Sequence, residues 1–180
     1  GSGTSDHGVT LDSSTITSAD GNIFIGGAHS AASFGSVGIL SWTAPQITVS
    51  NAGNITLEST NSIQMLPGSA TTLGSGTMTG RINIITNSLS NPDFTATTRG
   101  DVLIRPYASG TSIGISGGTC GSACTLKLTD TVLGMLHAND TLIIGDSADA
   151  AGLVDINGWD FSNKTYDVAI YGGTVDLTGG

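Results

Sequence analysis

Carboxylates are the first residues in this chain that could do chemistry, since acids far outnumber bases. A glycosidase needs two carboxylates about 5 to 10 Å apart, one of them with a raised pKa. Two pairs are close enough in sequence to be considered, Asp146 with Asp149 and Asp155 with Asp160. Each of these residues also suits a turn. We therefore predict that the chain is not an enzyme and has no catalytic residue.

The same acids are candidates for a calcium site, because calcium prefers oxygen ligands. The densest acidic cluster consists of Asp146, Asp149 and Asp155. Repeats of the form Gly-Gly-x-Gly-x-Asp-x-apolar-x are not reproduced, since the stretch 172–177 lacks the third glycine and the register. Solvated turn acids are the simpler interpretation, so we predict no cofactor and keep these three aspartates as the metal candidates.

Basic residues and histidines offer little further chemistry. A polysaccharide lyase would place a basic residue and bound calcium against an acidic sugar, which points to Arg81, Arg99 or Arg105. Arg105 comes just before a proline at a predicted strand end, where a solvated corner explains it. A Ser-His-Asp triad is unsupported, because the histidines are far apart in sequence and have no acid or nucleophile at a spacing that would indicate a triad. They are His7, His29 and His137.

Aromatic side chains could form platforms for carbohydrate binding. The candidates are Trp42, Tyr107, Trp159, Tyr166 and Tyr171. Trp159 and Tyr166 are close enough in sequence to share a face, so we predict these two as carbohydrate contacts. Stacking inside the fold is an equally good interpretation for them.

The charge balance limits the classes of partner. Five basic residues against fourteen acidic ones leave a net charge of -9. Nucleic acids and anionic membranes bind clustered Lys and Arg, and no basic patch can be identified here. The chain also lacks a run of about 18 apolar residues. We therefore predict neither nucleic-acid binding nor membrane insertion.

The elements that must position these residues follow from a short recurring pattern. A small residue and a polar residue precede apolar-x-apolar, which is the period-two pattern of a β-strand. The clearest copies are Gly21 to Ile25, Gly53 to Leu57, Gly80 to Ile84 and Gly100 to Ile104. Looser copies lie at 46–49, 62–65, 112–115, 125–128, 141–144 and 173–177. Strands this short need repeated neighbours to bury their apolar faces.

A longer repeat supplies such neighbours. Residues 16–25 resemble residues 47–57 with one insertion, and Gly8-Val9 resembles Gly38-Ile39 at a similar offset. The repeat is therefore about 30 residues long, which is typical of solenoids. Stacked coils place equivalent apolar residues above one another, so we predict an all-β parallel solenoid.

Three segments depart from the strand pattern. Residues 130–137 have apolar residues at helical spacing after a capping Thr or Asp, which predicts a short helix. The stretches 68–80 and 87–99 are predicted as wider loops. Gly1-Ser2-Gly3 looks like a cloning remnant, so residues 4–180 are expected to form a single solenoid fragment of a larger protein.

The second half contains the most specific phrases, namely Arg99-Gly100-Asp101-Val102-Leu103-Ile104-Arg105-Pro106-Tyr107 followed by residues 126–130 and 141–146. With these phrases and the Gly-Asn-Ile coils of the first half, nearly the whole chain resembles the giant exoproteins of the filamentous-haemagglutinin type. The resemblance implies a right-handed parallel β-helix shaft. Asn91-Pro92-Asp93 is only a fragment of the secretion-domain signature of that family, so the chain would be shaft and not export signal.

The resemblance also bears on the two cysteines. Cys120 and Cys124 are spaced so that they could close a small loop within a turn. The oxidising compartment that the resemblance implies favours a disulfide between them, with two reduced thiols as the alternative. A metal site is disfavoured, because no second cysteine pair or nearby histidine completes four ligands.

The expected function is therefore a structural and adhesive stalk of a secreted or cell-surface bacterial protein associated with the outer membrane. Its expected partner is a protein or glycan on another cell, and the open ends of the solenoid are expected to favour self-association. The alternatives are a carbohydrate-active β-helix, either lyase or hydrolase, and a calcium-dependent carbohydrate-binding module. Repeated weak contacts would supply the affinity of a stalk.

Overall fold

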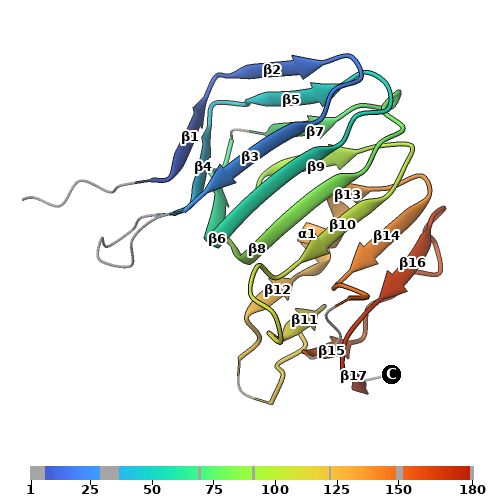
Figure 1. Ribbon diagram of the computed structural model, residues 1–180. Coiled ribbons are helices and arrows are strands. Elements are labelled where there is room, and N and C mark those ends of the chain that lie inside the picture. The colour runs from blue at the N-terminus through green and yellow to red at the C-terminus, as the bar shows by residue number, and fades with distance from the viewer. Residues whose placement is uncertain are drawn as a thin grey trace, which may run out of the picture.

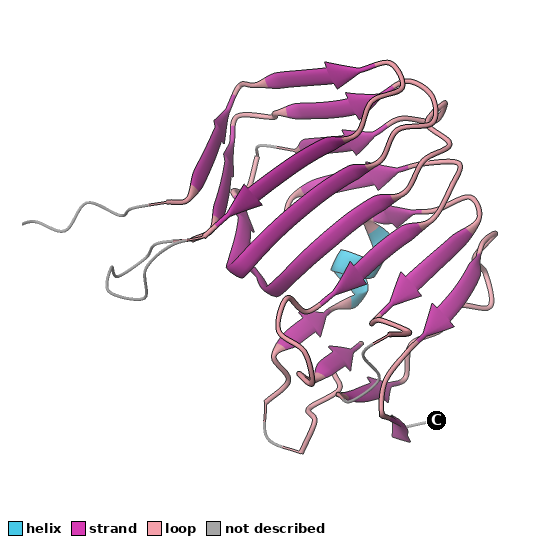
Figure 2. Ribbon diagram, viewed as in Figure 1, coloured by secondary structure: helices cyan, strands magenta, loops and turns pink. Residues whose placement is uncertain are grey.

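The computed structural model describes residues 7–28, 37–68, 70–90, 92–121, 123–148 and 152–178, and its arrangement is shown in Figure 1. This part of the chain is all-β apart from one short helix, which is cyan in Figure 2. Features that we predicted at residues 1–3, His29, Asn91 and Asp149 lie outside the described residues.

The strands form three sheets, and every described pair of neighbouring strands is parallel. Sheet A contains β1 (Val9–Asp12), β3 (Ile23–Gly27), β4 (Ile39–Trp42), β6 (Ile55–Met65), β8 (Ile82–Ser90), β10 (Val102–Arg105), β14 (Thr141–Ile144) and β16 (Asp167–Ile170). Sheet B contains β2 (Thr15–Ser18), β5 (Gln46–Val49), β7 (Thr71–Gly74), β9 (Phe94–Thr97) and β13 (Leu136–His137). Sheet C contains β11 (Ile113–Ile115), β12 (Leu126–Leu128), β15 (Leu153–Asn157) and β17 (Thr174–Thr178).

Strand β6 belongs to two parts of sheet A. Its first half pairs with β3 and its second half with β4, and the register against β8 shifts between Ser59 and Ser62. The buried Ser59 hydroxyl donates to the Ser62 carbonyl at 2.9 Å, and Thr86 makes the equivalent bond to Ser88 in β8. The Ser62 carbonyl also accepts the Gly38 N–H at 3.0 Å, so the Ser59 hydroxyl gives this oxygen a second donor next to the shift.

The self-similar segments of the sequence lie side by side in the structure. Val9 pairs with Ile39, Ile16 with Ile47, and Ile23 with Ile55. The chain thus returns to sheet B one strand further along each time, as the ribbon in Figure 1 shows for β2, β5, β7 and β9. All the apolar-x-apolar phrases that we identified contribute residues to strands.

Inward-facing apolar side chains form continuous rows across the strands. One row in sheet A consists of Ile25, Leu57, Ile84, Ile104, Ile144 and Ile170. Leu57, Ile84, Ile104 and Ile144 are at most 1% exposed. Burying each such side chain stabilises the fold by about 1.5 to 3 kcal/mol, so these rows are the main source of stability.

Both predicted wider loops are wrong as written. The stretch 68–80 contains β7, and the stretch 87–99 contains the end of β8 and all of β9. Leu73 and Phe94 are buried, and Leu73 lies in an apolar row between Ile47 and Ala96. The stretch 68–80 is rich in Gly, Thr and Ser, which is typical of loops. Thr is nevertheless β-branched and also fits a half-buried strand.

The predicted short helix is present as α1 (Asp130–Gly134), but it is shorter than the predicted 130–137, because Leu136–His137 form strand β13. The Thr129 hydroxyl accepts a hydrogen bond from the Val132 N–H at 3.3 Å, which is the N-cap arrangement. Val132 and Leu133 are buried against the core. No helix in the described ranges is long and apolar enough to cross a membrane.

Candidate functional site

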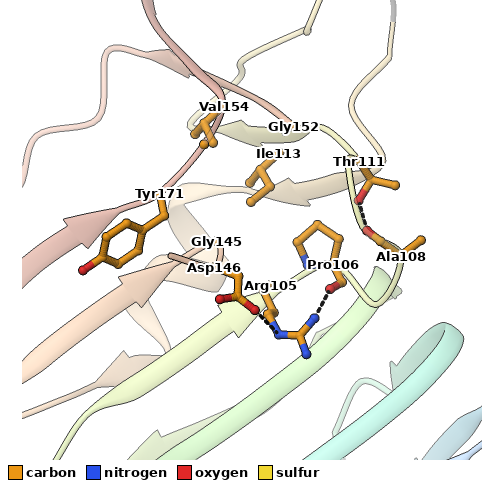
Figure 3. Close-up of a pocket in the computed structure, with 12 residues that line it drawn as sticks. Arg105, Pro106, Ala108, Thr111, Ile113, Gly145, Asp146, Gly152, Val154 and Tyr171 are labelled. Carbon is orange, nitrogen blue, oxygen red and sulfur yellow. Dashed lines mark hydrogen bonds and ion pairs between the residues drawn. The ribbon is translucent and has the colours of Figure 1, made fainter. Parts of the chain in front are cut away.

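Asp146 lies at a small cavity where the ends of β10 and β14 approach sheet C (Figure 3). Arg105, Val154 and Tyr171 also line this cavity, which has a volume of about 20 Å³. A single water needs about 10 to 15 Å³, so the cavity has room for one water and not for a sugar ring. Its size argues against a substrate pocket.

The Asp146 carboxylate is already engaged by neighbouring groups. Its Oδ2 lies 3.5 Å from Arg105 Nε, and its Oδ1 accepts a hydrogen bond from the Ala148 N–H at 2.9 Å. Arg105 Nη1 also donates to the Pro106 carbonyl at 3.0 Å, as drawn in Figure 3. Arg105 therefore connects the end of β10 with the segment that follows β14.

Asp155 serves a different part of the molecule. It lies in β15, is 6% exposed, and its Oδ2 accepts hydrogen bonds from the backbone N–H groups of Thr119 and Cys120 at 2.8 and 2.6 Å. Strand alternation places Asp155 on the opposite face from Val154, which lines the Asp146 cavity. Asp146 and Asp155 are thus used separately, and Asp149 lies outside the described residues.

The remaining acid of the predicted pairs, Asp160, is exposed and accepts a hydrogen bond from the Ser162 N–H at 2.9 Å. The Ser162 N–H and hydroxyl hold its pKa below the ordinary value, whereas a catalytic acid needs a raised pKa. Within the described ranges, no group of three or more His, Cys, Asp or Glu side chains could hold a metal ion. His137 lies in β13 of sheet B, whereas His7 lies outside the strands, just before β1 of sheet A.

Cys120 and Cys124 form a disulfide, with an S–S distance of 2.10 Å and Cα atoms 5.2 Å apart. The bond closes the turn that leads from β11 to β12. Cys124 packs directly on β11, because a Cβ at Gly114 would lie 2.4 Å from its Sγ. Only glycine fits at Gly114, and Asp155 fixes the other side of the same turn.

Trp159 and Tyr166 are half-buried and pack against the hydrophobic core. The Tyr166 hydroxyl reaches the Leu136 carbonyl of the edge strand β13 at 3.4 Å, and burial raises the pKa of this phenol. The Trp159 ring lies 5.1 Å from the Phe161 ring, measured between centroids. These contacts match the packing interpretation of the two residues. Their predicted role as carbohydrate contacts remains a prediction.

Open grooves lie on the outer surface of sheet A. One, of about 440 Å³, is polar, and there Arg81 Nη2 pairs with Asp101 Oδ2 at 2.5 Å. Another is lined by His7, Thr10, Asp12, Leu40 and Trp42. Sequence reasoning considered Trp42 but did not connect it with Asp12. Extending the Val9 and Ile39 repeat by three residues would have aligned them.

The Arg99 backbone N–H donates to the Met78 carbonyl, and the residue is exposed. Arg99 takes no part in the ion pair between Arg81 and Asp101. The sequence candidates are therefore distributed over several corners and grooves. Comparisons with models of protein families, with characterised proteins and with solved structures find no match for this chain.

Proposed function

We propose that the chain is a segment of a right-handed parallel β-helix that serves as a structural and adhesive stalk of a large secreted or cell-surface bacterial protein. The observation that carries this proposal is the repeated return of the chain to the same parallel sheets, with apolar residues in register. Such stacking makes a one-dimensional array whose coils contact only their neighbours. An array of this kind supplies length without needing an active site.

Other features of the chain support an extracellular stalk. The disulfide at Cys120 and Cys124 suits an oxidising compartment. The interior is filled by aliphatic rows, and the net charge of -9 favours solubility. The filamentous-haemagglutinin resemblance supplies the adhesive part of the proposal, with a protein or glycan on another cell as the partner.

The enzyme and calcium alternatives have less support. A glycoside hydrolase needs two carboxyl groups near each other, one of which has a raised pKa. The pKa of Asp160 is instead lowered. A calcium module needs several converging oxygen ligands, and Asp146 and Asp155 contact different turns. We therefore retain the stalk as the single proposed function.

Bead attachment tests the proposal. Beads that display the purified chain at high and low density are incubated with bacterial and animal cells, and beads coated with an unrelated acidic protein serve as the control. Weak repeated contacts predict attachment that rises steeply with density. Attachment no greater than that of the control beads at every density would contradict an adhesive role.

A further inference from the structure

The groove on the outer face of β1 and β4 combines an exposed aromatic ring with polar groups. We call it the Trp42 shelf and define it by His7, Thr10, Asp12, Leu40 and Trp42. Its volume is about 300 Å³, at the lower end of the range for small-molecule sites. Trp42 is 47% exposed, so a large apolar surface faces solvent there.

The strand register fixes the layout of the shelf. Asp12 pairs with Trp42 across β1 and β4, and Thr10 pairs with Leu40. Neighbouring strands lie about 4.8 Å apart, and paired residues point to the same face. The alternating residues Leu11 and Ser41 are buried. The Asp12 carboxylate therefore lies beside the Trp42 indole on the outer face.

The Asp12 carboxylate is held in place by the turns that follow the two strands. Its Oδ1 accepts hydrogen bonds from the Thr43 hydroxyl and, at 3.4 Å, from the Ser13 hydroxyl. The Ser13 N–H in turn donates to Thr43 Oγ1 at 3.1 Å. Among the described residues, Asp12 Oδ2 accepts no hydrogen bond. One oxygen is thus fixed by the protein and the other is left for a ligand.

His7 adds a donor to the shelf. The Val37 N–H donates to His7 Nδ1 at 3.2 Å, so the neutral ring has its proton on Nε2. The shelf then offers an acceptor at Asp12, a donor at His7 and a flat apolar surface at Trp42. A pyranose ring matches this set, because it has an apolar C–H face and hydroxyl groups around its edge.

Charge narrows the class of sugar. The shelf contains a carboxylate and no Lys or Arg, and the whole chain has a net charge of -9. An acidic sugar would be repelled by this field. We propose that the Trp42 shelf binds a neutral saccharide, with one pyranose ring stacked on the Trp42 indole and a hydroxyl donating to Asp12 Oδ2. This inference rests on the proposed adhesive function and names its ligand class.

Saturation-transfer NMR and tryptophan fluorescence test the inference directly. The purified chain is titrated with the methyl glycosides of glucose, galactose, mannose and N-acetylglucosamine, and with galacturonic acid as an acidic probe. We expect at least one neutral glycoside to bind with a Kd on the order of 1 mM, because one ring buries little area. Galacturonic acid is expected to bind at least tenfold more weakly.

Variants locate the binding to the shelf. Trp42→Ala is expected to weaken binding at least tenfold and Asp12→Asn about threefold to tenfold, while Trp42→Phe retains a ring and recovers part of the affinity. Phe24→Ala is the matched control, because Phe24 is 64% exposed on another part of sheet A. Circular dichroism and Tm check that each variant is folded.

Three results would overturn the inference. The first is that no neutral glycoside binds at a concentration 50 times the expected Kd of about 1 mM. The second is that Trp42→Ala binds with unchanged affinity. The third is that galacturonic acid binds more tightly than methyl galactoside. Bead attachment without saccharide binding would remove this inference alone. Saccharide binding without bead attachment would remove the adhesive function and leave the shelf in place.

Discussion

The first and last parts of the chain use the same parallel pairing but are stabilised differently. From β1 to β10, the chain returns to sheet A after a stretch of sequence that is about as long as the predicted repeat or shorter. Examples are the stretches from Ile55 to Ile82 and from Ile82 to Val102. The next return, from Val102 to Leu142, takes a much longer one. The early part is a regular stack, whereas in the late part β11, β12 and α1 are inserted between two neighbouring strands of sheet A, β10 and β14.

The inserted structure is stabilised by specific local contacts. Strands β11 and β12 follow one another and pair in parallel, so the turn between them must bring the chain back along the strand. The disulfide closes this turn, and Asp155 binds its backbone. The regular part is thus filled mainly by aliphatic rows with a few buried hydroxyls, whereas the inserted turn has a disulfide and a buried carboxylate.

The largest expected effect comes from breaking a row in the regular stack. Ile84→Ala removes a fully buried side chain between Leu57 and Ile104, and we expect a loss of about 3 to 4 kcal/mol in the free energy of unfolding. Urea unfolding followed by circular dichroism measures it. Thr95→Ser, at an exposed position of β9, is the control and should change stability by less than about 0.5 kcal/mol. A cost below about 1 kcal/mol for Ile84→Ala would mean that the rows do not support the stack.

A smaller and more local effect is expected from removing the disulfide. Cys120→Ala combined with Cys124→Ala opens a five-residue loop, whose closure entropy corresponds to about 2 kcal/mol. Amide hydrogen exchange should become faster in β11 and β12, with β5 and β7 unchanged. Reduction of the unmodified protein provides an independent comparison. Equal acceleration throughout all three sheets would show that the two regions are not separable.

Most strands of the regular region could be predicted from the sequence, with β7 and β9 as exceptions. The predicted strands follow from period-two phrases. The repeat alignment placed Ile16 beside Ile47, because similar sequence segments form equivalent strands. The short helix was predictable from Thr129 and the apolar spacing that follows it. The β7 and β9 strands were missed, because Thr-rich composition does not distinguish a loop from a half-buried strand.

The candidate site was predicted less well, because its geometry depends on contacts between distant segments. Closeness in sequence grouped Asp146 with Asp155, but strand alternation and the turn at Thr119 separate them. Asp12 and Trp42 are far apart in sequence and adjacent only through strand pairing. The spacing of the two cysteines was informative, since a short loop needs no knowledge of the rest of the fold.

The smallest expected effect concerns the segment from Trp159 to Tyr166, which contacts β13 through the Tyr166 hydroxyl. Tyr166 hydrogen-bonds to the Leu136 carbonyl, and burial raises the pKa of its phenol above the ordinary value of 10.0. A group whose pKa is raised in the folded state stabilises the protein below its unfolded pKa, and this contribution is lost as the pH rises through the folded pKa. The stability that the Tyr166 phenol provides should therefore be constant up to about pH 9 and decline above pH 10.

Urea midpoints of the unmodified protein and of Tyr166→Phe between pH 8 and pH 11 measure this contribution. The difference between the two should be small at pH 8, less than about 1 kcal/mol, because a 3.4 Å hydrogen bond is weak. This difference in stability should shrink or change sign above pH 10. Only the unmodified protein then carries an ionised Tyr166, whose phenolate must be either buried at a cost or exposed by loss of its contact. Tyr107→Phe controls for loss of a hydroxyl at an exposed site. A difference that does not vary with pH would mean that this segment does not pack on β13, and the late region would then be held by the disulfide turn alone.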